Sequence, residues 1–292
     1  TDDVRLAVIN ANPLGPVGIF NGGRQSETLS VNKQMLTPDV VRHAAYGLMT
    51  QEQIEHFNEE LEIDFAVSEP GLGRFRVNVF HQRGNPAMVL RYITADMPSL
   101  EELGLPMIMK DLVMIKRGLV LMVGATGSGK STSLAAMLNY RNETSSDHIL
   151  TVEDPIEFLH RNKKSIVNQR EVEVDTRSFA AALRSALRQD PDVILVGEMR
   201  DYETIETAIT AAETGHLVLS TLHTLDATET INRIISVFPP HQQKQVRLQL
   251  AAVLRAALAQ RLFAVDSHTR TRGIDSVRLK GTRFKLSTVP AL

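Results

Sequence analysis

The chain has 292 residues, with 32 basic and 34 acidic side chains, 43% hydrophobic residues and a formal net charge of −2. This composition is typical of a globular protein and excludes intrinsic disorder and a collagen-like fibre. The sequence has no cysteine, which excludes disulfides, thiolate metal sites and a thiol nucleophile, and favours a cytoplasmic location. The near-neutral charge argues against a broad nucleic-acid-binding surface.

The sequence also indicates a protein that does not insert into a membrane. Its apolar runs are shorter than the roughly 20 residues that a bilayer span needs, and its start lacks a basic-then-apolar signal pattern. The chain begins at Thr1 rather than Met, which leaves room for a missing leading segment. Its length suggests about two domains of roughly 150 residues each.

Residues 1–95 predict a small α+β domain. The first 35 residues are rich in Gly, Asn and Pro, which indicates turns and short strands. Thr37 is a candidate helix cap, followed by Pro38 and by apolar residues at helical spacing. Alternation of apolar and polar residues then predicts antiparallel strands over residues 64–68, 74–80 and 88–93.

A linker is predicted over residues 96–106, and the pattern changes after it. Residues 107–265 contain nearly continuous apolar runs at 118–123, 148–152, 193–196 and 217–222, separated by helical patterns. Such runs are typical of a mostly parallel sheet covered on both faces, so we expect an α/β domain. A last helix is predicted from the spacing of Val246, Leu250, Val253, Leu254, Ala257 and Leu258. Residues 266–292 form a polar, basic tail in which no element is predicted.

A phosphate-binding loop follows the run at 118–123 and matches the pattern G-x4-G-K-[ST] in full. The predicted nucleotide cradle consists of Gly124, Ala125, Thr126, Gly127, Ser128, Gly129, Lys130, Ser131 and Thr132. Its glycines let successive N–H groups face phosphate oxygens at the positive end of the next helix. Lys130 would reach the β- and γ-phosphates and the Ser131 hydroxyl would ligate Mg²⁺. The flanking strand and helix disfavour the alternative, a glycine turn with an incidental lysine.

Acidic residues follow two other predicted strands. Glu198 ends the run at 193–196 and is the candidate for the Mg²⁺ and water shell, the alternative being a surface glutamate that caps the helix near Asp201. Glu153, Asp154 and Glu157 follow the run at 148–152. This position suits a group that orients and deprotonates an attacking water, although carboxylates there also form ordinary turns.

Two further motifs have weaker chemical meaning. His216 and His223 bracket a strand at a spacing of seven, so they point to opposite faces and do not suit a shared metal ion. As isolated histidines they are also common in cores and on surfaces. Residues 32–34 (Asn-Lys-Gln) resemble a guanine-specificity motif, but Met35 stands where an aspartate is needed, so ATP is the expected nucleotide.

Four stretches together resemble one family. They are the phosphate loop at 124–131, residues 150–158 (LTVEDPIEF), residues 181–201 (AALRSALRQDPDVILVGEMRD) and residues 212–224 (AETGHLVLSTLHT). In this order they are similar to the Walker A, Asp box, Walker B and His box motifs of the secretion ATPase superfamily. The resemblance extends over residues 60–262 and is to the type IV pilus retraction ATPases of the PilT and PilU kind, with residues 116–137 leaning towards PilU.

The resemblance implies functions for several residues. Glu157 is expected to activate the lytic water, Glu198 to act on the metal side, and His216 and His223 to belong to the nucleotide site or a subunit interface. It also implies a PAS-like N-terminal domain and a RecA-like ATPase domain in a homo-hexameric ring. Arginines of the N-terminal domain would reach ATP, and the candidates are Arg76, Arg83 and Arg91, each of which could instead lie on a solvated strand face.

In cells, the resemblance implies a motor that hydrolyses ATP to retract type IV pili for twitching motility. Its partners would be an inner-membrane platform protein and a paralogous retraction ATPase, and it would sit in the cytoplasm at the inner membrane. The missing cysteines exclude the four-cysteine zinc module of the assembly ATPases. The first 35 residues and the tail from Val265 depart from the family pattern.

Two other functions stay open on the sequence. One is an accessory nucleotide-binding ring subunit that supports a paralogous motor. The other is a RecA-like secretion or DNA translocase, for which Arg161, Lys163, Lys164 and Arg170 would line a pore, although a solvated charged loop explains them better. A small-molecule kinase fits poorly, because no acceptor pocket is indicated.

Overall fold

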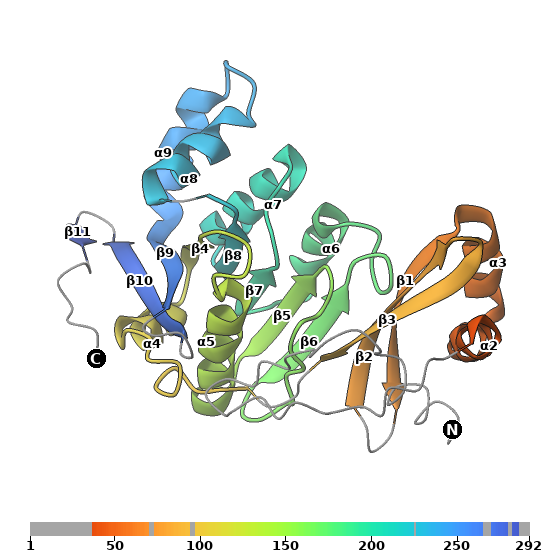
Figure 1. Cartoon of the computed structure of the whole chain (residues 1–292). Coiled ribbons are helices and arrows are strands. Elements are labelled where there is room, and N and C mark those ends of the chain that lie inside the picture. Colours follow the sequence, from red (N-terminus) through yellow and green to blue (C-terminus); the bar gives the residue numbers. More distant parts are fainter. Residues whose placement is uncertain are drawn as a thin grey trace. The chain divides into compact units, whose positions relative to one another are not determined.

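The computed structural model of the chain describes residues 37–69, 73–93, 97–224, 226–264, 270–279 and 282–285, with side chains as far as residue 261. The turns predicted for the first 35 residues, and the guanine-like motif at 32–34, lie outside the described residues. The chain divides into two compact units, Thr1–Ala95 and Asp96–Leu292, which are coloured from red to blue along the sequence in Figure 1.

The described residues of the first unit include two helices, α2 (Pro38–Leu48) and α3 (Gln51–Glu60). Thr37 caps α2 as predicted: its side chain accepts a hydrogen bond from the Val40 N–H, and Pro38 follows at the start of the helix. A capping box between Thr50 and Gln53 begins α3. Both starts are therefore fixed by local sequence.

Three antiparallel strands follow in the described part of this unit, namely β1 (Glu62–Glu69), β2 (Gly73–Gln82) and β3 (Asn85–Ile93). They confirm the strands predicted from alternation. Phe65, Val77 and Val79 pack with Phe57 of α3 in one core. Arg76 lies on the other face of β2, because neighbouring residues of a strand point to opposite faces.

The second unit has one mixed sheet of eight strands, in the order β11-β10-β9-β4-β8-β7-β5-β6. The six strands from β9 to β6 in this order run parallel to one another. Strand β10 pairs antiparallel with both β9 and β11. Their bounds are β4 (Gly118–Val123), β5 (His148–Glu153), β6 (Ile166–Glu171), β7 (Val193–Val196), β8 (Leu217–Leu222), β9 (Leu254–Ala264), β10 (Arg270–Leu279) and β11 (Thr282–Lys285).

Helices cover both faces of this sheet (Figure 1). They are α4 (Ile108–Val113), α5 (Lys130–Thr144), α6 (Phe179–Ala186), α7 (Tyr202–Glu213), α8 (Ala227–Ser236) and α9 (Gln243–Val253). Residues of α4 and α5 pack against Val120 and Met122 of β4, while α6 to α9 pack against Leu121 and Val123. Alternate residues of β4 thus enter two different cores, which explains why its sequence is apolar throughout.

The structure corrects the predicted last helix. The helix ends at Val253, and Leu254, Ala257 and Leu258 belong to strand β9. The prediction was wrong because β9 has both faces buried at these residues, so it lacks the alternation that distinguishes a strand from a helix.

Two other segments also differ from the sequence expectations. Leu100 and Leu105, placed in a linker, are buried in the core beside α4. The tail, for which no element was predicted, contains β10 and β11. In the part of the chain that the structure describes, no helix has the length and apolar character needed to cross a bilayer.

Candidate nucleotide-binding site

The phosphate loop connects the end of β4 to the start of α5. Gly124, Gly127 and Gly129 all have positive φ angles, of 151°, 75° and 89°, which favour glycine. A Cβ atom on Gly124 would lie 2.4 Å from the Gln260 carbonyl oxygen and 2.7 Å from the Ser128 Oγ. The loop is therefore packed closely on β9. It leads into α5, whose first backbone N–H groups have no acceptor within the helix and are available to a ligand.

Lys130 is the first residue of α5 and is buried. Its Nζ donates hydrogen bonds to the carbonyl oxygens of Gly124 (2.9 Å) and Ala125 (3.0 Å). Burial lowers the pKa of Lys130, while the carboxylates of Glu198 and Glu157 act in the opposite direction. Charged groups that follow β5 and β7 thus act on the lysine that follows β4.

Glu198 and His223 connect these strand ends. A Glu198 carboxylate oxygen lies 2.6 Å from Arg200 Nη2 and 3.4 Å from His223 Nε2. The other ring nitrogen of His223, Nδ1, lies 3.4 Å from Lys130 Nζ and 3.3 Å from Thr126 Oγ1. His223 therefore bridges the carboxylate and the lysine.

The end of β5 carries a half-buried glutamate, Glu153, and the segment after it carries an exposed one, Glu157. The Glu153 carboxylate accepts hydrogen bonds from Thr151 Oγ1 (2.6 Å), Gln169 Nε2 (3.2 Å) and the backbone N–H of Glu157. Burial raises the pKa of Glu153. The Glu157 side chain is exposed, as is that of Asp154, and of the two it is the Glu157 carboxylate that acts on the charge of Lys130.

The structure thus brings Lys130, His223 and Glu198 into contact at the carboxyl edge of the parallel sheet, and places Glu157 near enough for its charge to act on Lys130. His216 lies elsewhere in the chain. Its carbonyl accepts the Gly118 N–H at the start of β4, and its Nδ1 is 2.9 Å from the Ala211 carbonyl oxygen. Six strand residues, about 20 Å, separate this edge from the phosphate loop, so a role for His216 in this chain's own cradle has no support from the geometry.

The three candidate arginines all lie in the first unit. Arg76 and Arg91 are directly opposite each other on β2 and β3, and Arg76 Nε lies 3.5 Å from Asp64 Oδ1. Arg83 is in the turn between these strands with a positive φ of 53°. Their roles at a nucleotide remain a prediction.

The donors present suit Mg²⁺ bound together with a nucleotide. Among the residues described, no group of three or more His, Asp or Glu side chains is placed to hold a metal ion. Mg²⁺ in phosphate sites takes one or two protein oxygens and completes its shell with phosphate oxygens and water. The Ser131 hydroxyl, next to Lys130 in the sequence, and the Glu198 carboxylate, whose charge acts on Lys130, are oxygens of this kind.

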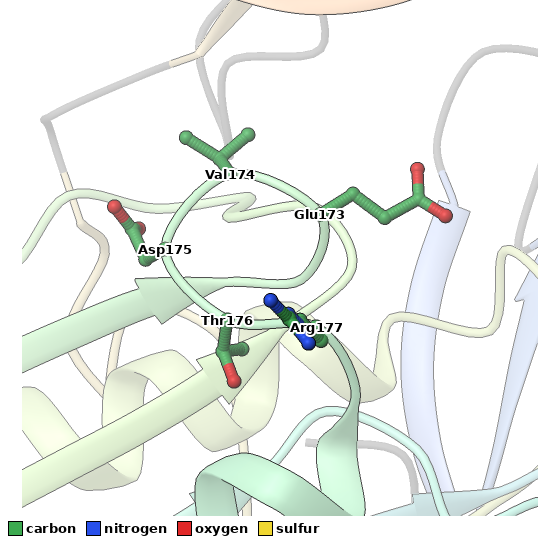
Figure 2. Close-up of a pocket in the computed structure, with 5 residues that line it drawn as sticks. All are labelled: Glu173, Val174, Asp175, Thr176 and Arg177. Carbon is green, nitrogen blue, oxygen red and sulfur yellow. The ribbon is translucent and has the colours of Figure 1, made fainter.

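Sequence reasoning gave no role to Arg200 or Gln169, which the structure places in this network. Arg200 lies two residues beyond Glu198, and that spacing on an irregular segment was the available signal. Gln169 had no signal, since its contacts join β6 to the segment after β5. A separate hollow of about 440 Å³ is lined by residues 173–177 and includes none of Lys130, Glu157, Glu198 and His223. Figure 2 labels the five residues that line it.

Comparisons with known proteins agree with this geometry. Residues 60–288 match the family described as type II/IV secretion system protein. The chain belongs to this family. It is 48% identical over 251 residues to the type IV pilus ATPase PilU of Pseudomonas aeruginosa, covering 86% of this chain and 66% of the relative. It is 52% identical over 233 residues to the type IV pilus retractation ATPase PilT of the same organism, covering 80% and 68%. The chain thus spans about two thirds of the length of these relatives.

Solved structures give the same result. A crystal structure of the pilus retraction motor PilT with bound ADP matches with a TM-score of 0.81 and 50% identity, covering 84% of this chain and 71% of that one. The Legionella pneumophila ATPase DotB matches with a TM-score of 0.73 and 30% identity, covering 86% and 71%. The predicted α/β fold and the predicted family are confirmed.

Proposed function

We propose that this chain binds and hydrolyses ATP and works as a hexameric motor in type IV pilus retraction. The convergence of Lys130, Glu157, Glu198 and His223 at one edge of the sheet supports this most directly. The 50% identity to a pilus retraction motor that binds ADP favours the same nucleotide class here.

ATP would bind with its phosphates against the loop amides and the first turn of α5. Lys130 Nζ, now bonded to the Gly124 and Ala125 carbonyls, would turn to the β- and γ-phosphates. Ser131 and Glu198 would hold Mg²⁺, which neutralises phosphate charge when bound. The buried Ser128 Oγ has no hydrogen-bond partner among the described residues, so it is a further donor for a phosphate oxygen.

Glu157 would orient the attacking water in line with the terminal phosphate and accept its proton. His223 lies between Glu198 and Lys130, where it would hold the carboxylate and reach the terminal phosphate. Arg76, Arg83 or Arg91 of a neighbouring subunit would compensate the charge that develops there, a contribution worth about 10³ to 10⁵ in rate in other phosphoryl-transfer enzymes.

Release of phosphate would then remove the charge that holds those arginines. The segment between the two units would act as a hinge, and successive hinge motions around a ring would move material at its centre. That material would be the inner-membrane platform of the pilus, which places the protein in the cytoplasm at that membrane, beside a paralogous retraction ATPase.

A second candidate function is an accessory ring subunit that supports a paralogous motor, favoured by the 48% identity to PilU. Phosphate release by the purified chain, measured beside a Lys130→Ala variant, separates the two. We expect ATP-dependent phosphate release by the wild type and a rate at least about 100-fold lower in Lys130→Ala. The variant lacks the ammonium charge that stabilises the negative charge of the transferred phosphoryl group. Equal, background rates for both proteins would reject the motor and leave the accessory role.

A further inference from the structure

The segment that carries Glu157 is neither helix nor strand. It spans residues 154–165 between β5 and β6, and Glu157 is exposed within it. An irregular segment has no ladder of backbone hydrogen bonds to fix its side chains. Other contacts must therefore hold the Glu157 carboxylate in one place.

The first of these contacts is Glu153, which accepts the Glu157 N–H. Gln169 of β6 in turn donates its Nε2 to the Glu153 carboxylate at 3.2 Å. The same Nε2 donates to the Phe158 carbonyl oxygen at 2.8 Å, and Gln169 Oε1 accepts the His160 N–H at 2.8 Å. One side-chain amide thus holds the chain both before and after Glu157.

Glu171 provides a second attachment from the same face of β6, two residues further along. Its side chain is buried, and its Oε2 accepts the Ile156 N–H at 3.2 Å. Ile156 is the residue immediately before Glu157. Hydrogen bonds from Gln169 and Glu171 therefore reach the backbone on both sides of the proposed water-activating group.

The loop after β6 braces Glu171. Asp175 Oδ2 accepts the Glu171 N–H at 2.8 Å, and the N–H groups of Asp175 and Thr176 donate to the Glu171 carbonyl oxygen. Figure 2 shows this loop closing on itself, with the Glu173 and Val174 side chains pointing away from it. The Val172 N–H also donates to the Glu153 carbonyl oxygen at 2.9 Å. The loop and β6 thus form one support for the segment.

We propose that Gln169 and Glu171 are positioning residues for ATP hydrolysis, because they hold the Glu157 carboxylate where it meets the attacking water. This inference rests on the proposed function of Glu157. Gln169 is bonded to the Glu153 carboxylate and to the backbone of Phe158 and His160, and Glu171 accepts the Ile156 N–H. Both therefore act on Glu157 through the segment that carries it. A displacement of about 1 Å at a reacting group can cost about 100-fold in rate, which gives two hydrogen-bonding side chains a measurable effect.

Steady-state ATP hydrolysis by the full chain tests the proposal. We expect Gln169→Ala and Glu171→Ala to lower kcat about 10- to 100-fold, with the KM for ATP unchanged because the Lys130 loop is untouched. Glu171→Gln keeps an acceptor oxygen for the Ile156 N–H, so it should restore most of the kcat lost in Glu171→Ala. Asn168→Ala is the matched control, since Asn168 precedes Gln169 on β6 and its side chain contacts His148 instead.

A Glu157→Gln variant separates this proposal from the function on which it rests. Loss of hydrolysis in Glu157→Gln, with no further loss on adding Gln169→Ala, supports both. Loss in Glu157→Gln while Gln169→Ala and Glu171→Ala keep the wild-type kcat overturns the positioning role alone. Full activity in Glu157→Gln overturns both. If Gln169→Ala fails to fold, the pair Glu171→Ala and Glu171→Gln decides: equal kcat values for the two would overturn the proposal.

Discussion

Lys130 shows how a single buried charge is accommodated before a ligand arrives. Burial disfavours its ammonium group and lowers its pKa, and the carboxylates of Glu198 and Glu157 offset only part of that cost. The ammonium also donates hydrogen bonds to two nearby carbonyl oxygens. The same opposite charges that stabilise the lysine are those proposed to act on water and metal. A bound phosphate would therefore replace the carbonyl oxygens as the partner of the Lys130 ammonium, while the fold already holds Glu157 and Glu198 in place.

His160 leads to a prediction at the residue scale. Burial and the positive charge of Lys163 lower its pKa to about 4, whereas an unfolded histidine has a pKa near 6.5. Between about pH 6.5 and pH 4 the unfolded chain binds a proton that the folded chain does not, so the free energy of unfolding decreases as the pH is lowered. At pH 5 this loss is about 2 kcal/mol.

Urea unfolding of the wild type and a His160→Gln variant at pH 7.5 and pH 5 measures this effect. The variant should lose about 2 kcal/mol less between the two pH values than the wild type. His241→Gln is the control, because His241 is exposed on the surface. This variant should show the same change in the free energy of unfolding between the two pH values as the wild type. The same pH dependence in His160→Gln and the wild type would contradict the prediction.

At the scale of elements, the phosphate loop depends on its contact with β9. Gly124 has no room for a side chain, because its hydrogen faces the Gln260 carbonyl and the Ser128 hydroxyl, whereas Gly127 faces open space. The two glycines have positive φ angles in common. Gly127→Ala therefore introduces backbone strain alone, whereas Gly124→Ala adds displacement of the loop to its own backbone strain.

We expect Gly127→Ala to cost about 1–2 kcal/mol of stability from the left-handed backbone, with nucleotide affinity reduced less than about 3-fold. Gly124→Ala should move the loop off β9 and weaken binding of a fluorescent ADP analogue at least about 10-fold, equivalent to about 1.4 kcal/mol. Fluorescence titration and thermal melting of both variants provide the measurement. Equal affinities for the two variants would show that contact with β9 does not shape the cradle.

At the scale of the whole molecule, the proposed mechanism places the catalytic residues on different subunits. The cradle belongs to the second unit, and Arg76, Arg83 and Arg91 belong to the first. If an arginine acts on the ATP of a neighbouring subunit, a chain that lacks the arginine and a chain that lacks Lys130 can complement each other in a mixed ring. The first chain supplies an intact cradle and the second supplies the arginine. Complementation requires a closed assembly, in which each interface combines two chains.

Each arginine is therefore replaced by alanine in turn and mixed with Lys130→Ala. We expect at least one arginine variant to be inactive alone and to recover activity on mixing, up to about one quarter of the wild-type rate at equal amounts, if subunits exchange randomly and interfaces act independently. Light scattering with and without ATP follows assembly in the same samples. A chain that stays monomeric under all conditions, or inactive mixtures for every arginine, would contradict catalysis across subunits.

The sequence by itself determined the phosphate loop, the start of α2 at Thr37 and the apolar strands β4, β5, β7 and β8. Each of these depends on residues close together in the sequence: spaced glycines followed by a lysine, a cap and its helix, or a strand buried on both faces. The family followed from four such local stretches in order.

The tertiary structure alone decided which of the candidate groups meet. The parallel order of the sheet brings Glu157, Glu198 and His223 to Lys130, and places His216 at the other edge. It also decided that strand β9 begins at Leu254. Burial on both faces of that strand removes the alternation of apolar and polar residues by which a strand is predicted from sequence. The support of Glu157 by Gln169 and Glu171 was also decided by the tertiary structure. These hydrogen bonds join β6 to residues 9 to 16 positions earlier, and such spacings follow no period in the sequence.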